Sequence, residues 1–189
     1  MIEGDSLDYS LLNDWADFDC NGYYTCEIGV RRGLGSKIIM DQVKNNYFHI
    51  GVDPYGDRVY QHTDNDANSK WNGKPTPPTY PDSMRDQLMK DFHWYIKQGK
   101  FHLANMTDTD FMGSNEYKDK RFALVHFDGP HTTKDVINES IWFANRAAPK
   151  TRFIFDDYKT YDMQTVADCL HHFSFKPLAK GENKILLEN

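Results

Sequence analysis

The chain has 189 residues, of which 39% are hydrophobic and 26% are charged, and this composition excludes a disordered protein. Its net charge of −6 argues against nucleic acid as the main partner, because phosphate binding needs a basic surface. No apolar run approaches the ~20 residues of a membrane helix, and no signal peptide or metal-type cysteine spacing is visible, so we expect one cytoplasmic domain over residues 1–189.

The first half of the chain alternates between strand and helix patterns. A buried strand is predicted over Tyr24–Val30, followed by a glycine-bearing loop over Arg31–Gly35. The next segment, Ser36–Lys44, predicts a helix that has Ser36 as its N-cap. A second strand is predicted over Phe48–Asp53.

A long polar segment over residues 54–81 interrupts this alternation. It is rich in proline, and loops of this length without regular structure are usually functional lids or disordered. Because Trp71 and Tyr80 give the segment aromatic side chains to pack, we interpret it as a lid.

The second half of the chain resumes the alternation. A Thr-x-x-Asp pattern at Thr132 and Asp135 marks a helix start. The further predicted elements are, in chain order, a helix over Asp82–Gln98, strands over Phe101–Met106 and Phe122–Phe127, a helix with a buried face of Ile137, Ile141, Ala144 and Ala148, a strand over Arg152–Phe155, a helix marked by Met163, Val166, Leu170 and Phe173, and a hairpin of Phe175–Leu178 and Lys184–Leu187.

Strands separated by helices predict parallel β-α-β units with helices on both faces of one sheet. We therefore expect an α/β fold, a Rossmann-like three-layer sandwich with a mostly parallel sheet and an antiparallel C-terminal hairpin. In such sheets ligands bind beyond the carboxyl ends of the strands, so the residues that follow each strand are the candidates for a site.

Glycines follow the first predicted strand, at Gly29 and Gly33. They let the backbone approach a ligand closely, and the following helix N-terminus offers unpaired N–H groups to a carboxylate or phosphate. Their spacing does not match Gly-x-Gly-x-x-Gly, which argues against a dinucleotide. A plain turn between strand and helix is the alternative.

Polar residues also follow the second and third predicted strands. A carboxylate at the position of Asp53 can accept both hydroxyls of a ribose, and the alternative is a loop-capping residue ahead of Pro54. The segment that contains Thr107 could line an adenine pocket, and the alternative there is an ordinary turn.

Three aspartates follow the next two strands, Asp128 after one and Asp156 and Asp157 after the other. If these strands are neighbours, their ends lie about 5 Å apart and the carboxylates converge. They would repel one another unless a divalent cation such as Mg²⁺ neutralised them. His131 is a candidate general base for a substrate hydroxyl. Solvated aspartates and a histidine without a chemical role are the alternatives.

These motifs together resemble the class I S-adenosylmethionine-dependent methyltransferases. More narrowly, they resemble the branch that includes metal-dependent sugar O-methyltransferases and cephalosporin-hydroxylase-like proteins. The resemblance extends from Tyr24 to Tyr158, and it is carried by Glu27-x-Gly29-x-x-x-Gly33, Asp53, Asp128-Gly129-x-His131 and Asp156-Asp157.

The resemblance implies a seven-stranded sheet whose last strand is reversed. It also implies that Glu27, Gly29 and Gly33 shape a cofactor loop. Ser36 would then lie near the methionine carboxylate of S-adenosylmethionine, and Asp53 would hold its ribose hydroxyls.

The same resemblance implies that Asp128, Asp156 and Asp157 ligate a divalent metal, with Mg²⁺ expected, that grips two substrate oxygens. His131 and Asp128 are then the candidate catalytic residues. The expected activity is metal-assisted O-methylation of a small-molecule or sugar hydroxyl. The alternatives are another nucleotide-binding enzyme such as an oxidoreductase, an inactive binding module, and metal-dependent hydrolysis or hydroxylation.

Overall fold

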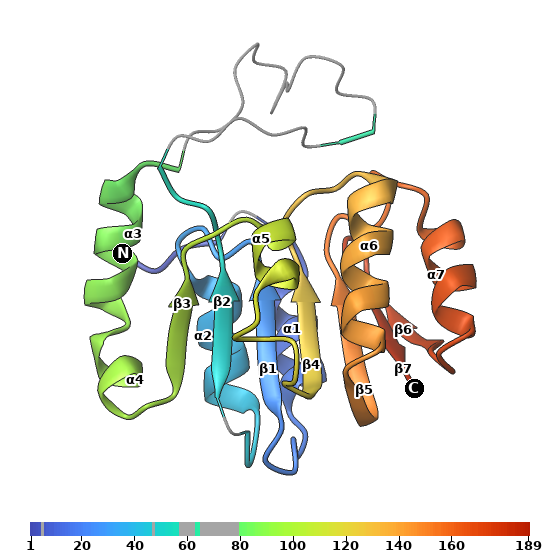
Figure 1. Ribbon diagram of the computed structural model, residues 1–189, viewed down its shortest axis with the longest axis horizontal. Helices are drawn as coiled ribbons and strands as arrows, with labels where there is room; N and C mark the ends of the chain where they lie inside the picture. The colour runs from blue at the N-terminus through green and yellow to red at the C-terminus, as the bar shows by residue number, and fades with distance from the viewer. Residues whose placement is uncertain (5, 47, 57–62, 65–79) are drawn as a thin grey trace.

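The computed structural model describes residues 1–4, 6–46, 48–56, 63–64 and 80–189, and their strands form a seven-stranded sheet (Figure 1). The spatial order is β3-β2-β1-β4-β5-β7-β6. The first five strands are mutually parallel, and β7 pairs antiparallel with both β5 and β6. The strands are β1 (Tyr24–Ile28), β2 (His49–Val52), β3 (Phe101–Ala104), β4 (Phe122–Phe127), β5 (Ala147–Phe155), β6 (Lys176–Lys180) and β7 (Ile185–Glu188). The predicted sandwich, its mostly parallel sheet and its C-terminal hairpin are confirmed.

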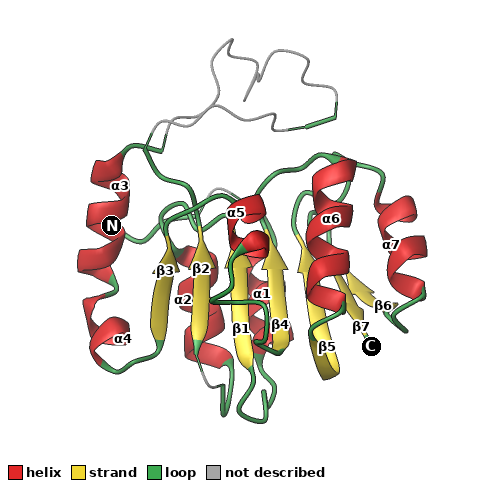
Figure 2. Cartoon of the chain, viewed as in Figure 1, coloured by secondary structure: helices red, strands yellow, loops and turns green. Residues whose placement is uncertain are grey.

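Helices cover both faces of the sheet (Figure 2). Buried side chains of α1, α2 and α3 pack on one face, and those of α5, α6 and α7 pack on the other. The helices are α1 (Tyr9–Ala16), α2 (Leu34–Gln42), α3 (Asp82–Asp91), α4 (His93–Lys97), α5 (Asp108–Gly113), α6 (Thr133–Ala144) and α7 (Met163–His171).

The central strand β1 divides its side chains between these two layers. Cys26 and Ile28 belong to the apolar core under α5, α6 and α7. Thr25 and Glu27 alternate with them, so they point to the opposite face, and both are fully buried there. A buried polar layer therefore lies between the sheet and α2.

Two predicted helix details are wrong. Ser36 is not an N-cap, because α2 begins two residues earlier and Gly33, at φ 85°, holds the cap position. Ala148 does not continue the helical face of α6 but lies in β5. The residue before a proline is biased towards extended backbone, and Pro149 follows Ala148.

Three other helical features differ from the sequence analysis. The helix predicted over Asp82–Gln98 is divided at Phe92 into α3 and α4. The short α5 and the N-terminal α1 were not predicted, although Leu12 and Ala16 form a buried i, i+4 pair in α1. The Thr132 cap is confirmed, because its hydroxyl accepts the backbone N–H of Asp135 at 3.1 Å.

The predicted lid over 54–81 falls mostly outside the described residues. Of its described part, Thr63 forms an isolated parallel bridge with His131, and Asp64 accepts the backbone N–H of Thr133 at 3.0 Å. Within the described residues, no helix is both long and apolar enough to cross a membrane. Cys20, Cys26 and Cys169 are unpaired.

Candidate active site

Four polar or glycine positions come together at the carboxyl edge of the sheet. Ile28 pairs in register with the last residues of both β2 and β4, and the last residues of β4 and β5 also pair. The residues that follow these strands therefore lie side by side, in the order Asp53, Gly29, Asp128 and Asp156. This register confirms that aspartates distant in the sequence gather at one edge.

Asp53 holds the glycine loop in place. Its Oδ2 accepts the backbone N–H groups of Val30 at 3.0 Å and Arg31 at 2.8 Å. Its Oδ1 is buried and has no hydrogen-bond partner among the described residues. Burial raises the pKa of Asp53 to about 7, and the two N–H donors oppose that rise. One carboxylate oxygen thus fixes the loop while the other remains available to a ligand.

The glycine loop lies directly against the strand that carries Asp128. Gly29 and Gly33 both have φ of 85°, a backbone conformation that favours glycine. A Cβ atom on Gly29 would lie 2.0 Å from the carbonyl oxygen of Asp128. The close approach of the two segments therefore requires glycine at position 29.

A chain of buried hydrogen bonds runs beneath this loop in the polar layer. Thr25 Oγ1 lies 2.9 Å from His49 Nδ1, and His49 Nε2 lies 2.9 Å from Ser36 Oγ. Ser36 donates to Glu27 Oε2, and Glu27 Oε1 lies 2.8 Å from His126 Nδ1. Because Ser36 donates to Glu27, it accepts from His49, which fixes the neutral His49 tautomer. Ser36 is therefore occupied on both sides by protein groups.

The buried side chain of His49 should make the stability of the fold sensitive to acid. Burial, with repulsion from His126, lowers the pKa of His49 from 6.5 to about 3. Between these two pH values the unfolded chain binds a proton that the folded chain does not, so His49 makes the free energy of unfolding fall as the pH falls, by up to about 1.4 kcal/mol per pH unit. We expect the free energy of unfolding, measured in urea between pH 4 and 7, to depend less steeply on pH in His49→Gln than in the wild type. The control His171→Gln, at an exposed position of α7, should keep the wild-type pH dependence. Equal slopes in all three proteins would contradict this assignment.

Asp156 is the most heavily engaged of the three aspartates. Its Oδ1 accepts from Ser6 Oγ at 2.8 Å, from Asn183 Nδ2 at 2.9 Å and from the Asp157 backbone N–H at 2.8 Å. Its Oδ2 lies 2.6 Å from Lys184 Nζ, and both side chains are completely buried. Burial acts to raise the pKa of Asp156, but Lys184, His126 and Ser6 together outweigh it, so that pKa is lowered.

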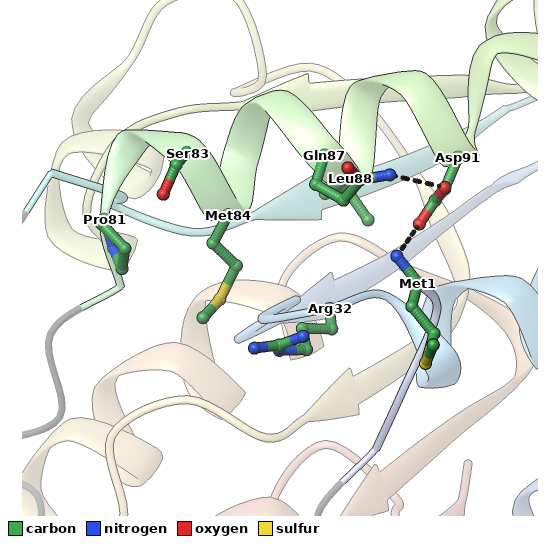
Figure 3. Close-up of a pocket in the computed structure, with 8 residues that line it drawn as sticks. All are labelled: Met1, Arg32, Pro81, Ser83, Met84, Gln87, Leu88 and Asp91. Carbon is green, nitrogen blue, oxygen red and sulfur yellow. Dashed lines mark hydrogen bonds and ion pairs between the residues drawn. The ribbon is translucent and has the colours of Figure 1, made fainter.

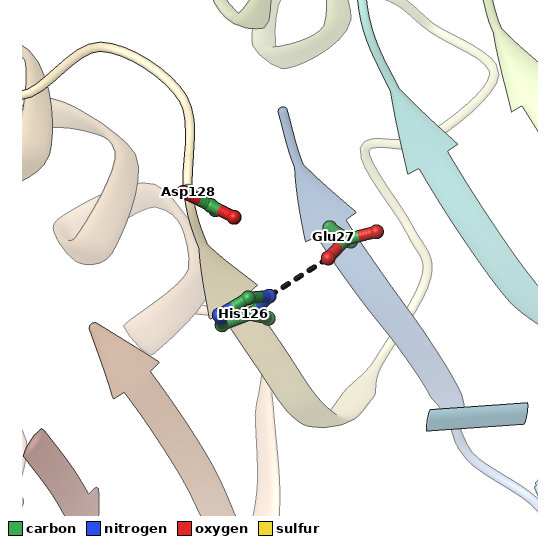
Figure 4. A group of neighbouring side chains, drawn as sticks. All are labelled: Glu27, His126 and Asp128. Carbon is green, nitrogen blue, oxygen red and sulfur yellow. Dashed lines mark hydrogen bonds and ion pairs between the residues drawn. The ribbon is translucent and has the colours of Figure 1, made fainter. Parts of the chain in front are cut away.

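Asp128 has the opposite electrostatic setting. Burial and the neighbouring Asp156 charge raise the pKa of Asp128 well above its ordinary value, with Lys184 opposing them. Asp128 also converges with Glu27 and His126, and these three residues each offer one nitrogen or oxygen atom within 4.8 Å of the others (Figure 4). Glu27 and His126 are already hydrogen-bonded to each other in this group.

His131 lies between two carboxylates on the α6 side of the edge. Its Nε2 is 3.9 Å from Asp128 Oδ1, and its Nδ1 is 3.6 Å from Asp157 Oδ2. Its ring stacks on Tyr161 with a centroid distance of 6.1 Å. Asp157 therefore turns to His131, whereas Asp156 turns to Lys184.

A separate cavity of about 180 Å³ lies on the α3 side of the glycine loop (Figure 3). Its wall includes Arg32 of the loop and Leu88 of α3. At one end the Met1 ammonium pairs with Asp91 at 2.6 Å. Asp128, Asp156 and Asp157 are not among the described residues that line this cavity.

The structure places most of the predicted site residues at this edge, but it adds three that the sequence analysis missed. Thr107 is the N-cap of α5, where its hydroxyl accepts the backbone N–H of Asp110. The missed residues are His49, His126 and Lys184. The strand register gives the signal for two of them, because His49 pairs with Thr25 and His126 pairs with Glu27.

Comparison with known proteins adds to this geometry. A family described as a methyltransferase domain matches residues 26–158. No curated protein sequence matches the chain.

Several solved structures share the fold. An O-methyltransferase from Bacillus cereus, solved with SAH, has a TM-score of 0.59 at 9% identity, over 99% of this chain and 84% of that one. A calicheamicin methyltransferase has a TM-score of 0.56 at 15% identity, over 95% and 76%. A 16S rRNA methyltransferase from T. thermophilus, solved with AdoMet and guanosine, has a TM-score of 0.59 at 13% identity, over 98% and 44%. At these identities the likeness shows the fold alone.

Proposed function

Because this chain belongs to the methyltransferase-domain family, we propose that it is an S-adenosylmethionine-dependent O-methyltransferase acting on a hydroxyl of a small molecule or sugar. The main structural support is the position of Asp53. One of its carboxylate oxygens fixes the glycine loop, and the other is buried and can accept a hydrogen bond from a ligand. The SAH-bound B. cereus structure supports the cofactor. The net charge of −6 supports a small acceptor over RNA.

The glycine loop and Asp53 bind and orient the cofactor in this proposal. S-adenosylmethionine supplies an electrophilic methyl group on its sulfonium, so the protein contributes position and a dry environment. Asp53 Oδ1 accepts from the ribose hydroxyls, and Gly29 and Gly33 let the loop backbone lie against the ligand.

His131 takes the proton of the acceptor hydroxyl. The Asp157 carboxylate, 3.6 Å from His131 Nδ1, stabilises the imidazolium that forms by Coulomb attraction. This mechanism uses no divalent cation, because Asp156 Oδ1 accepts three hydrogen bonds and Asp156 Oδ2 is paired with the Lys184 ammonium at 2.6 Å.

The first test concerns cofactor binding. Asp53→Asn keeps an oxygen for the loop N–H groups but replaces the second oxygen with a donor. We expect the affinity for S-adenosylmethionine to fall about ten- to hundredfold, equivalent to about 1.4–2.7 kcal/mol, in isothermal titration. Asp64→Asn is a control among the described carboxylates, because Asp64 bonds Thr133 instead. Tight NAD binding without S-adenosylmethionine binding would favour an oxidoreductase and would overturn the proposal.

The second test separates chemistry from binding. His131→Gln should lower kcat for methyl transfer about 10²- to 10⁴-fold while leaving the affinity for S-adenosylmethionine unchanged, since a general base acts only in the reaction. This kcat is measured by the transfer of radiolabelled methyl groups to sugar, catechol and RNA acceptors. An unchanged kcat would remove His131 from the mechanism, and RNA as the preferred acceptor would overturn the substrate class.

A further inference from the structure

Lys184 occupies a position built for a cation. It immediately precedes β7, and its side chain is completely buried. Its Nζ lies 2.6 Å from Asp156 Oδ2, 3.1 Å from Ser6 Oγ and 3.5 Å from His126 Nε2. Ser6 and His126 lie within hydrogen-bond distance of the ammonium, and the Asp156 carboxylate is its ion-pair partner.

The backbone fixes the lysine in this position. Asp8 Oδ2 accepts the backbone N–H groups of Asn183 at 2.7 Å and of Lys184 at 3.3 Å. The pairing of Phe155 with Ile185 in the antiparallel β5–β7 ladder brings Lys184 opposite Asp156. The strand register and the N-terminal segment therefore fix the backbone of Lys184, and this places its ammonium next to Asp156.

We propose that the Lys184 ammonium is the resident cation of the carboxyl edge and takes the place beside Asp156 that a divalent metal would otherwise need. Asp156 Oδ1 already accepts three hydrogen bonds, and Asp156 Oδ2 lies 2.6 Å from the Lys184 Nζ, so among the described residues the ammonium fills the place beside this carboxylate where Mg²⁺ or Mn²⁺ would have to bind. A fixed positive charge at this point also repels a divalent ion.

The edge nevertheless contains an acidic pair that a metal could use if the lysine were removed. Asp128 and Asp156 lie beside each other at the ends of neighbouring strands. Without Lys184, two carboxyl groups and a histidine nitrogen would face the space that the ammonium now fills. A divalent ion is the replacement charge that this donor set favours.

Titration with Mn²⁺, followed by electron paramagnetic resonance and calorimetry, tests the proposal on the whole chain. The wild-type protein should show no stoichiometric binding up to about 1 mM Mn²⁺, a Kd equivalent to about −4.1 kcal/mol. Lys184→Met should bind Mn²⁺ at least about tenfold more tightly, and the added substitution Asp156→Asn should abolish that gain. Lys180→Met, an exposed lysine of the same hairpin, should behave as wild type.

Two results would overturn the proposal. One is stoichiometric Mn²⁺ binding by the wild-type protein that Asp156→Asn removes. The other is a folded Lys184→Met protein that gains no Mn²⁺ affinity. If Lys184→Met does not fold, Lys184→Gln provides the same comparison with a side chain that can still hydrogen-bond, and the wild-type titration decides in any case.

These measurements do not depend on the proposed function. A protein that transfers no methyl group but also binds no Mn²⁺ would refute O-methylation and leave the role of Lys184 intact. Methyl transfer that is abolished by a chelator and restored by Mn²⁺ would support O-methylation and refute the role of Lys184.

Discussion

Replacement of Lys184 with methionine should lower the free energy of unfolding by about 3–5 kcal/mol. The ion pair with Asp156 is completely buried on both sides, at 2.6 Å. Removal of the ammonium leaves the Asp156 carboxylate buried next to Asp128, with no opposite charge at bonding distance among the described residues. The cost comes mainly from this stranded charge and not from the lost attraction.

A double-mutant cycle separates these two contributions. Lys184→Met combined with Asp156→Asn removes both charges, so it should recover at least about 2 kcal/mol of the loss in urea unfolding. Lys180→Met on exposed β6 should change stability by less than about 0.5 kcal/mol. If the double variant is as unstable as the single one, packing of the lysine stem and not its charge is responsible.

The sequence predicted the sheet edge well because that edge depends on local signals. Apolar runs such as Phe122–Phe127 mark strands, and parallel pairing then brings their carboxyl ends together. Asp53, Gly29 and Asp128 could be placed at the edge from this rule alone, since each follows the end of a strand.

The sequence did not predict the partners of these residues, because those depend on strand register. Lys184 faces Asp156 only because β7 inserts between β5 and β6 with Phe155 opposite Ile185. A hairpin pattern fixes neither the insertion nor the register. The divalent metal expected at Asp128, Asp156 and Asp157 stays a prediction, and the sequence alone did not indicate that the Lys184 ammonium pairs with one of these carboxylates.

His126 illustrates a polar residue hidden within an apolar pattern. The apolar run FALVHF predicts a buried strand, and the single histidine in it does not change that prediction. Only the pairing of β1 with β4 shows that His126 lies beside Glu27, with Nδ1 at 2.8 Å from Oε1. Alternation along β1 and β4 could have placed both side chains on the α2 face, but not in contact.

Substitution of Gly29 by alanine should destabilise the fold by about 3–5 kcal/mol and remove measurable binding of SAH. Two effects add. The φ of 85° is disfavoured for alanine by about 1–2 kcal/mol, and the new Cβ would lie 2.0 Å from the Asp128 carbonyl oxygen and 2.5 Å from its carbon. Backbone atoms cannot rotate away as a side chain can, so the glycine loop and the β4 end must separate, which displaces Asp53 and Asp128 from each other.

Gly22→Ala measures the conformational part of this effect alone, so its difference from Gly29→Ala gives the steric part. Gly22 has a φ of 79°, close to that of Gly29, but no atom lies within 4 Å of the position of its Cβ among the described residues. It should therefore lose only about 1–2 kcal/mol in urea unfolding and should bind SAH as wild type does. Equal losses in the two variants would show that the glycine loop tolerates a side chain at position 29, and the close approach to Asp128 would then not constrain the cofactor loop. A larger loss at Gly29, together with lost SAH affinity, ties the binding loop to the strand that carries the acidic edge.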